Sequence, residues 1–184
     1  MKTSIAVALV FATLVAGASA QVQHPYAGMQ ARPVKALSDQ QISDLKSGRG
    51  MGLALAAELN GYPGPSHLLE LADQLALTAD QRAIVKGMFE AMKAEAIPLG
   101  ESLIAQETAL DRLFAGRTVT PESLQAATAA IGETQARLRD THLKYHLSTA
   151  EILQPQQLQR YAELRGYTGA ASPHDHKMHK PSSN

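Results

Sequence analysis

Two histidines have the spacing of a metal-chelating pair. His142 and His146 are four residues apart, so on a helix they lie one above the other on the same face. Two such imidazoles can hold one Zn²⁺, Ni²⁺ or Cu²⁺ ion, with a third ligand from Glu95, Glu101 or the C-terminal tail. The alternative is that both histidines lie in a packed interface, where hydrogen bonds satisfy them.

A second group of histidines lies near the C-terminus. His174, His176 and His179 fall within six residues, together with an aspartate and a methionine. Imidazole and thioether groups bind soft or borderline divalent metals without a preformed fold. The alternative is a solvated tail with no metal. We expect residues 167–184 to be a disordered, histidine-rich tail because they are dominated by Gly, Ser, Pro and His.

Motifs of known enzyme classes are absent from the sequence. It contains no Cys-x-x-Cys-His, no His-Glu-x-x-His, no glycine-rich phosphate loop and no Gly-x-Ser-x-Gly. No histidine has a glutamate three residues before it, so the Glu-x-x-His pairs of di-iron bundles are missing too. We therefore expect a protein that is not an enzyme and requires no cofactor, with a divalent transition metal (Zn, Cu or Ni) as its candidate ligand.

Met88, Phe89 and Met92 form an apolar group that could bind a varied partner. Methionine and phenylalanine side chains accommodate partners of different shape. This predicts an adaptable surface for unfolded polypeptides. The alternative is that the three side chains belong to the core or to a dimer interface, which is what an apolar helix face usually does.

A long amphipathic helix positions these residues. Between residues 77 and 116, apolar side chains recur at steps of three and four, which places them on one helix face. Pro98, followed by Gly100, predicts a bend rather than an end. Thr120 and Pro121 then provide an N-cap and a favourable first residue for a second long helix, which ends near residue 153.

Shorter helices are expected on both sides of this pair. Ser38 and Gln41 form a capping box for a helix from 37 to about 60, Ser66 caps a helix from 67 to 76, and the last helix ends near Arg165. No segment shows the alternation typical of a strand. We predict an all-α fold, a long antiparallel helical hairpin with short flanking helices. Because these cover the hairpin thinly, we expect a cradle-like homodimer.

The first twenty residues have the pattern of a signal peptide. A basic start and an apolar run precede Ala18-Ser19-Ala20, which predicts cleavage after Ala20 and export. The expected organisation is a signal peptide (1–20), a flexible leader (21–36), a helical domain (37–166) and the tail (167–184). After removal of the signal peptide, no segment is apolar enough to span a membrane.

Composition excludes further classes. There is no cysteine, so neither disulfides nor thiolate metal sites can form. The 17 basic and 17 acidic residues of the chain become 16 and 17 when Lys2 is removed with the signal peptide. A chain of balanced charge with only eight Phe and Tyr residues and no Trp has neither the basic patch nor the stacking surfaces of a nucleic-acid-binding protein.

Two copies of one motif carry a family resemblance. Leu77, Thr78 and Gln81 form a Leu-Thr-x-x-Gln element, and Leu153 and Gln157 belong to a degenerate copy after the hairpin. Physically, each element is a capping box. Over roughly residues 66–166 the sequence resembles the LTxxQ-motif (Spy/CpxP) family of periplasmic stress proteins.

The resemblance implies a periplasmic, cradle-shaped helical homodimer. It also implies one of two functions. The first is an ATP-independent chaperone or adaptor of the envelope stress response, which binds unfolded envelope proteins. The alternative is a heavy-metal-binding sensor or resistance protein that modulates a sensor kinase.

Overall fold

The computed structural model describes residues 25–168, and every regular element in this range is helical. The all-α class predicted from the sequence is therefore confirmed for this part of the chain. The predicted signal peptide and the tail histidines His174, His176 and His179 lie outside the described residues. In chain order the elements are a 3₁₀-helix η1 (Met29–Ala31) and the α-helices α1 (Asp39–Lys46), α2 (Leu55–Glu58), α3 (Pro65–Glu70), α4 (Ala79–Ala115), α5 (Pro121–Glu151) and α6 (Pro155–Leu164).

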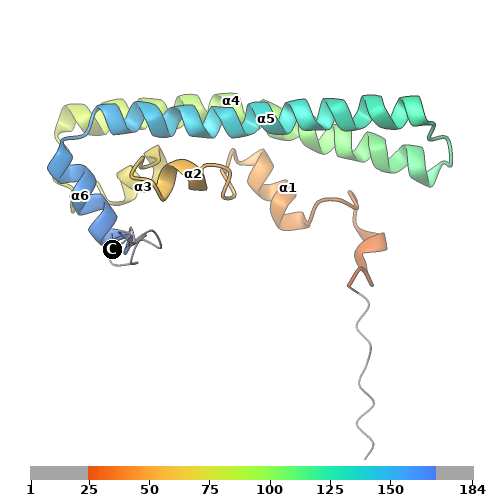
Figure 1. Cartoon of the computed structure of the whole chain (residues 1–184), viewed down its shortest axis with the longest axis horizontal. Helices are drawn as coiled ribbons and strands as arrows, with labels where there is room; N and C mark the ends of the chain where they lie inside the picture. Colours follow the sequence, from red (N-terminus) through yellow and green to blue (C-terminus); the bar gives the residue numbers. More distant parts are fainter. Residues whose placement is uncertain (1–24, 169–184) are drawn as a thin grey trace, which may run out of the picture.

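The two long helices, α4 and α5, pack together as the predicted hairpin (Figure 1). The predicted caps are present: the hydroxyl of Thr78 accepts the Gln81 N–H at 3.1 Å, and that of Thr120 accepts the Ser123 N–H at 3.2 Å. Pro98 lies inside α4 without ending it. Within residues 25–168, no helix combines the length and apolarity that a bilayer span needs.

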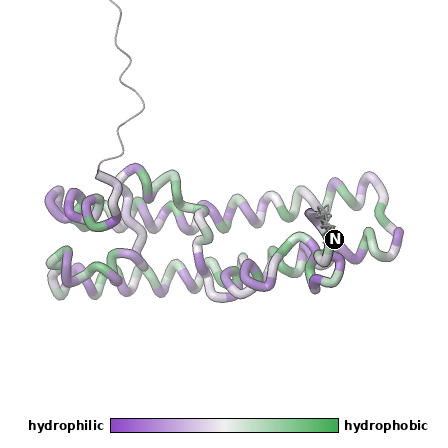
Figure 2. Tube along the Cα trace, turned by 90° about the horizontal axis from the view of Figure 1, so that it is seen from below, coloured by the Kyte–Doolittle hydropathy of each residue, from purple (hydrophilic) through white to green (hydrophobic). Residues whose placement is uncertain are grey.

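The shorter helices lie along one side of the hairpin. α1, α2 and α3 follow one another there, and α6 turns to the same side at the end near α3 (Figure 1). Seen from this side, hydrophobic and hydrophilic residues are interspersed along the whole hairpin (Figure 2).

Two apolar clusters attach the shorter elements to the hairpin. One joins the N-terminal segment and α1 to α4 and α5, and its buried members are Val34, Leu37, Leu45, Ala96, Leu103, Ile131 and Leu138. The other joins α3 and α6 to the end of the hairpin, and its buried members are Leu68, Ala72, Leu75, Leu77, Val85, Leu153 and Tyr161. Burial of these side chains is the main force that holds the flanking helices in place.

The helix predicted from residue 37 to about 60 is divided, which corrects that expectation. α1 ends at Lys46, and regular helix resumes only at Leu55. Between them, Gly48 and Gly52 have φ angles of 67° and 82°, and Met51 has φ 44°. Left-handed backbone cannot continue a right-handed helix, so the glycines make a turn here instead of weakening one helix.

The next helix also differs from its prediction. It begins at Pro65 after Gly64, which gives no side-chain cap, so the expected cap at Ser66 is wrong. Proline is favoured at the first helical position because it has no N–H to satisfy. The helix ends at Glu70, and a turn with left-handed Ala76 (φ 48°) leads to α4.

The expected flexible leader is docked at its C-terminal end. Val34 is buried in the first apolar cluster, and Lys35 Nζ lies 3.2 Å from Asp111 Oδ2 near the end of α4. An apolar anchor and a long-range ion pair fix this part of the segment to the hairpin, so the leader is shorter than residues 21–36.

Candidate functional site

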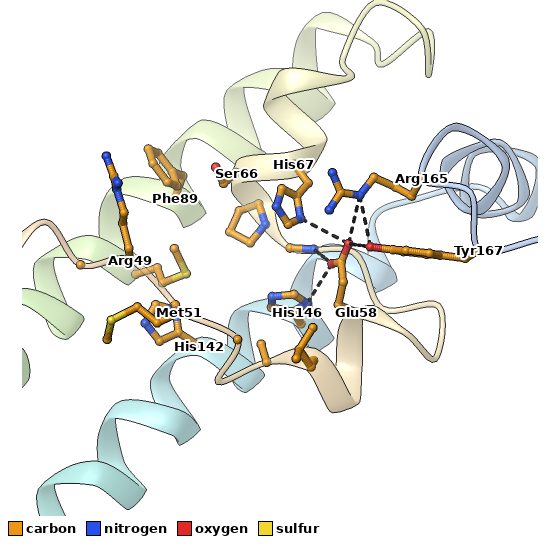
Figure 3. A pocket seen from close by; sticks show the side chains of 18 residues that line it. Arg49, Met51, Glu58, Ser66, His67, Phe89, His142, His146, Arg165 and Tyr167 are labelled. Atoms are coloured by element: carbon orange, nitrogen blue, oxygen red, sulfur yellow. Dashed lines mark hydrogen bonds and ion pairs between the residues drawn. The ribbon is translucent and has the colours of Figure 1, made fainter. Parts of the chain in front are cut away.

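A cavity of about 320 Å³ lies between the hairpin and the segment that connects α1 to α3. α4, α5, this segment and the C-terminal end of the described chain all contribute to its lining (Figure 3). The lining combines imidazoles, a carboxylate and thioethers: His67, His142, His146, Glu58, Met51 and Met92. A concave, largely apolar site with a few polar groups is the usual form of a ligand site.

Glu58, in α2, is a buried carboxylate at the edge of this cavity (Figure 3). Its Oε1 accepts the hydroxyls of Tyr161 and, at 3.0 Å, Tyr167. Its Oε2 accepts the backbone N–H of Gly64 at 3.2 Å, and Arg165 Nε lies 3.5 Å from Oε1. One carboxylate therefore ties α2 to the start of α3 and to the C-terminal helix.

These contacts decide the charge of Glu58. Burial alone would raise its pKa, but the His67 imidazole and the Tyr161 hydroxyl, among others, lower the pKa to about 2. The pKa of Tyr161 is raised, first by burial of its hydroxyl and then by the adjacent Glu58 carboxylate. Glu58 is thus ionised at neutral pH and Tyr161 is a permanent hydrogen-bond donor to it.

His146 is held in one tautomer. Its Nδ1 lies 2.7 Å from the carbonyl oxygen of Tyr62 and 3.7 Å from Glu58 Oε2. A carbonyl only accepts, so Nδ1 carries a proton, and in the neutral ring Nε2 has the lone pair. A Cβ added at Gly64 would lie 2.6 Å from Nε2, so only glycine leaves room for the ring.

His142 is 2 % exposed, and its Nε2 has no hydrogen-bond partner within residues 25–168. The pKa of His142 is lowered, first by burial of the ring and then by the neighbouring His146. The imidazole is therefore neutral at neutral pH. A Cβ on Gly50 would lie 3.3 Å from its Nδ1, so the turn before α2 packs closely against the ring.

His67 is the third imidazole that lines the cavity. Its Nδ1 lies 3.3 Å from Glu58 Oε1, within ion-pair distance but without hydrogen-bond geometry. In Figure 3 the His67 side chain, from α3, points towards this carboxylate.

The metal pair predicted from the sequence is only partly assembled. His142 and His146 do line one cavity, as their spacing predicts. Glu95, an expected third ligand, accepts the Tyr145 hydroxyl at 2.8 Å and pairs with Lys144 instead. Among the described residues, no three or more His, Asp or Glu side chains are grouped to hold an ion.

The two motif glutamines meet each other, which the sequence does not reveal. Gln81 Nε2 donates to Gln157 Oε1 at 2.9 Å, and Gln157 Nε2 donates to Gln81 Oε1 at 3.0 Å. Each Oε1 also accepts the N–H of its own N-cap, Thr78 or Gln154. Each Nε2 has a second acceptor as well, a backbone carbonyl at Ile152 or Leu75. Every donor and acceptor of both amides is satisfied.

This paired amide explains what the repeated motif does. The first copy begins α4 and the second begins α6, and Leu77 and Leu153 lie in the same apolar cluster. The two capping boxes therefore join the base of the hairpin by a polar contact beside an apolar one.

The apolar group on α4 is less exposed than a binding surface would be. Met92 is 6 % exposed, and Met88 and Phe89 are half-buried. Phe89 and Met92 line the cavity. In the single chain Met92 is therefore buried, whereas Met88 and Phe89 remain partly exposed.

A different apolar surface faces solvent beside the cavity. Four large apolar side chains follow at steps of four, four and three residues, and their exposed fractions are 42 %, 52 %, 57 % and 41 %: Met51, Leu55, Leu59 and Tyr62. We call this set the apolar strip. Leu55 and Leu59 are one helical turn apart, and Ala57 and Glu58 between them are buried. Met51 and Leu55 also line the cavity.

Comparison with family models, with curated proteins and with solved structures finds no match for this chain.

Proposed function

We propose that this chain is an exported, ATP-independent chaperone or adaptor that binds unfolded polypeptides in the periplasm. The observation that carries the proposal is the apolar strip. Large apolar patches exposed on a folded protein mark sites of interaction, and four large apolar side chains are exposed within these twelve residues.

The strip suits a varied partner. It lies on a turn and one short helix, in a segment that glycines interrupt. Its side chains include a methionine and a tyrosine, which make apolar contacts of adaptable shape and, for tyrosine, a hydrogen bond at the edge. An unfolded client of unspecified sequence needs such contacts more than a rigid complementary pocket.

The hairpin gives this surface a stable support. The paired amides of Gln81 and Gln157 join the start of α4 to the start of α6 at the base of the hairpin. The resemblance of these motif copies to the LTxxQ-motif family supports a role in envelope stress. A homodimer that joins two strips, and docking onto a sensor kinase, belong to the same proposal.

Suppression of aggregation tests the proposal. The chain without its predicted signal peptide (21–184) is mixed in excess with a chemically denatured client on dilution, and light scattering is followed. We expect scattering to fall without nucleotide. The double variant Leu55→Ser/Leu59→Ser should lose most of this effect, because it makes the centre of the strip polar.

A matched control separates the strip from general surface apolarity. Phe114 and Leu124 lie on either side of the hairpin turn and are 54 % and 37 % exposed. Phe114→Ser/Leu124→Ser also removes two exposed apolar side chains, and it should suppress aggregation like the unaltered chain. No suppression by the unaltered chain, or equal loss in both variants, would contradict the proposal.

A further inference from the structure

We propose that the cavity binds one soft monovalent metal ion, Cu⁺ or its redox-inert analogue Ag⁺, through the imidazoles of His142 and His146 and the thioether of Met51. This site shares Met51 with the apolar strip, but it does not depend on the client-binding function proposed above. It also differs in kind from a divalent Zn²⁺ or Ni²⁺ site.

His146 is already oriented as a metal ligand. Its Nδ1–H donates to the Tyr62 carbonyl, with Glu58 behind it at 3.7 Å. Metal-bound histidines commonly direct the other ring nitrogen to a carbonyl or carboxylate, which fixes the tautomer and the ring plane. In the neutral ring the lone pair is then on Nε2, where it can bind a metal ion.

His142 supplies a second neutral imidazole one helical turn away. Its ring has no hydrogen-bonded partner at Nε2, and a buried polar atom without a partner is unusual enough to require a reason.

Met51 brings sulfur to the same place. It directly follows Gly50, whose backbone packs against the His142 ring, and both Met51 and His142 line the cavity (Figure 3). Met51 also has φ 44°, a left-handed backbone that is costly for any residue with a Cβ and is often associated with function. The thioether of Met92 lines the same cavity.

The charge and softness of these groups select the ion. Imidazole and thioether ligands are neutral, so a monovalent ion leaves a single positive charge, whereas a divalent ion would leave two without an anionic ligand. Glu58 is occupied by its own hydrogen bonds. Thioether sulfur prefers Cu⁺, and the lack of any described group of three His, Asp or Glu side chains disfavours Zn²⁺ and Ni²⁺.

Methionine methyl NMR tests the site directly. The chain (21–184) is labelled with ¹³C at its methionine methyl groups and titrated with Ag⁺ or Zn²⁺. We expect one equivalent of Ag⁺ to shift the Met51 methyl signal, while Met29 and Met88 stay unchanged as internal controls. Zn²⁺ should leave Met51 unchanged. His142→Gln/His146→Gln should abolish the Ag⁺ shift of Met51.

A second variant keeps the test decisive if the histidine variant does not fold. Met51→Leu preserves the size and apolarity of an exposed side chain, and it should weaken Ag⁺ binding to the cavity at least tenfold in a competition titration. A response confined to Met178 in the tail would overturn the proposal. So would a Met51 shift that survives loss of both histidines, or unchanged Ag⁺ affinity in Met51→Leu.

Discussion

Gly100 lies where the structure leaves no space for a side chain. It lies inside α4, where alanine would ordinarily stabilise the helix by about 0.5–1 kcal/mol. Here a Cβ would lie 2.5 Å from the carbonyl oxygen of Leu45 and 2.9 Å from its carbonyl carbon. These are backbone atoms, so they move only if α1 moves away from α4.

The two effects have opposite sign, and the steric one is the larger. Forcing one methyl into a packed contact costs about 1–3 kcal/mol, and a contact with backbone belongs at the upper end. After the gain in helix propensity, Gly100→Ala should lower the free energy of unfolding by about 2 kcal/mol. The loss should fall on the docking of α1, whose Leu45 is buried in the first apolar cluster.

Chemical denaturation followed by circular dichroism measures this change. Gly87→Ala on α4 and Gly132→Ala on α5 are matched controls, since a Cβ at either position meets nothing within 4 Å. Both controls should raise the free energy of unfolding by about 0.5–1 kcal/mol. If Gly100→Ala stabilises the chain as the controls do, α1 does not approach α4 as described.

Three further predictions follow from the polar contacts. In a double-mutant cycle of Gln81→Ala and Gln157→Ala, the losses in free energy of unfolding should depart from additivity by about 1 kcal/mol, because each amide satisfies the other. Additive losses would exclude the hydrogen-bonded pair of amides. Glu58→Gln should destabilise the chain by about 2 kcal/mol at pH 7. The pKa of Glu58 is about 2 in the folded chain against 4.5 ordinarily. The stability difference between the unaltered chain and Glu58→Gln should therefore disappear as pH falls from 4.5 towards 2. A difference in the free energy of unfolding that is equally large at pH 7 and at pH 2 would refute this prediction. The pKa of His142 is lowered from 6.5, so the unfolded chain binds its proton more readily. Stability should therefore fall below pH 6.5, and less so in His142→Gln; an equal fall in both would refute the buried neutral imidazole.

Local capping chemistry made most of the fold predictable. Thr78, Thr120 and Ser38 mark helix starts that the structure confirms, because a cap depends on residues three positions apart in the sequence. Helical periodicity likewise predicts the hairpin. The sequence did not predict the break after Lys46. Gly48 and Gly52 only weaken a helix by themselves, and whether they end it depends on the contacts around them.

Long-range contacts made the site unpredictable. Glu58 is one acidic residue in an otherwise apolar segment, and this was its only signal in the sequence. Its partners Tyr161 and Tyr167 are 103 and 109 residues away, and no local pattern connects them. The pairing of Gln81 with Gln157 was hidden for the same reason, although the repeat of the motif marked both residues. The spacing of His142 and His146 did predict their common face, but not Gly64, which makes room for one of the rings.

The most direct test of the proposed function is binding of an unfolded client by the apolar strip. The chain contains no tryptophan, so the tryptophan emission of a reduced and alkylated client reports only on the client. On titration with the chain (21–184), we expect this emission to shift to shorter wavelength as the client enters an apolar environment. Leu55→Ser/Leu59→Ser should weaken the shift strongly, and Phe114→Ser/Leu124→Ser should leave it unchanged. An emission spectrum that does not change with the unaltered chain would contradict the account.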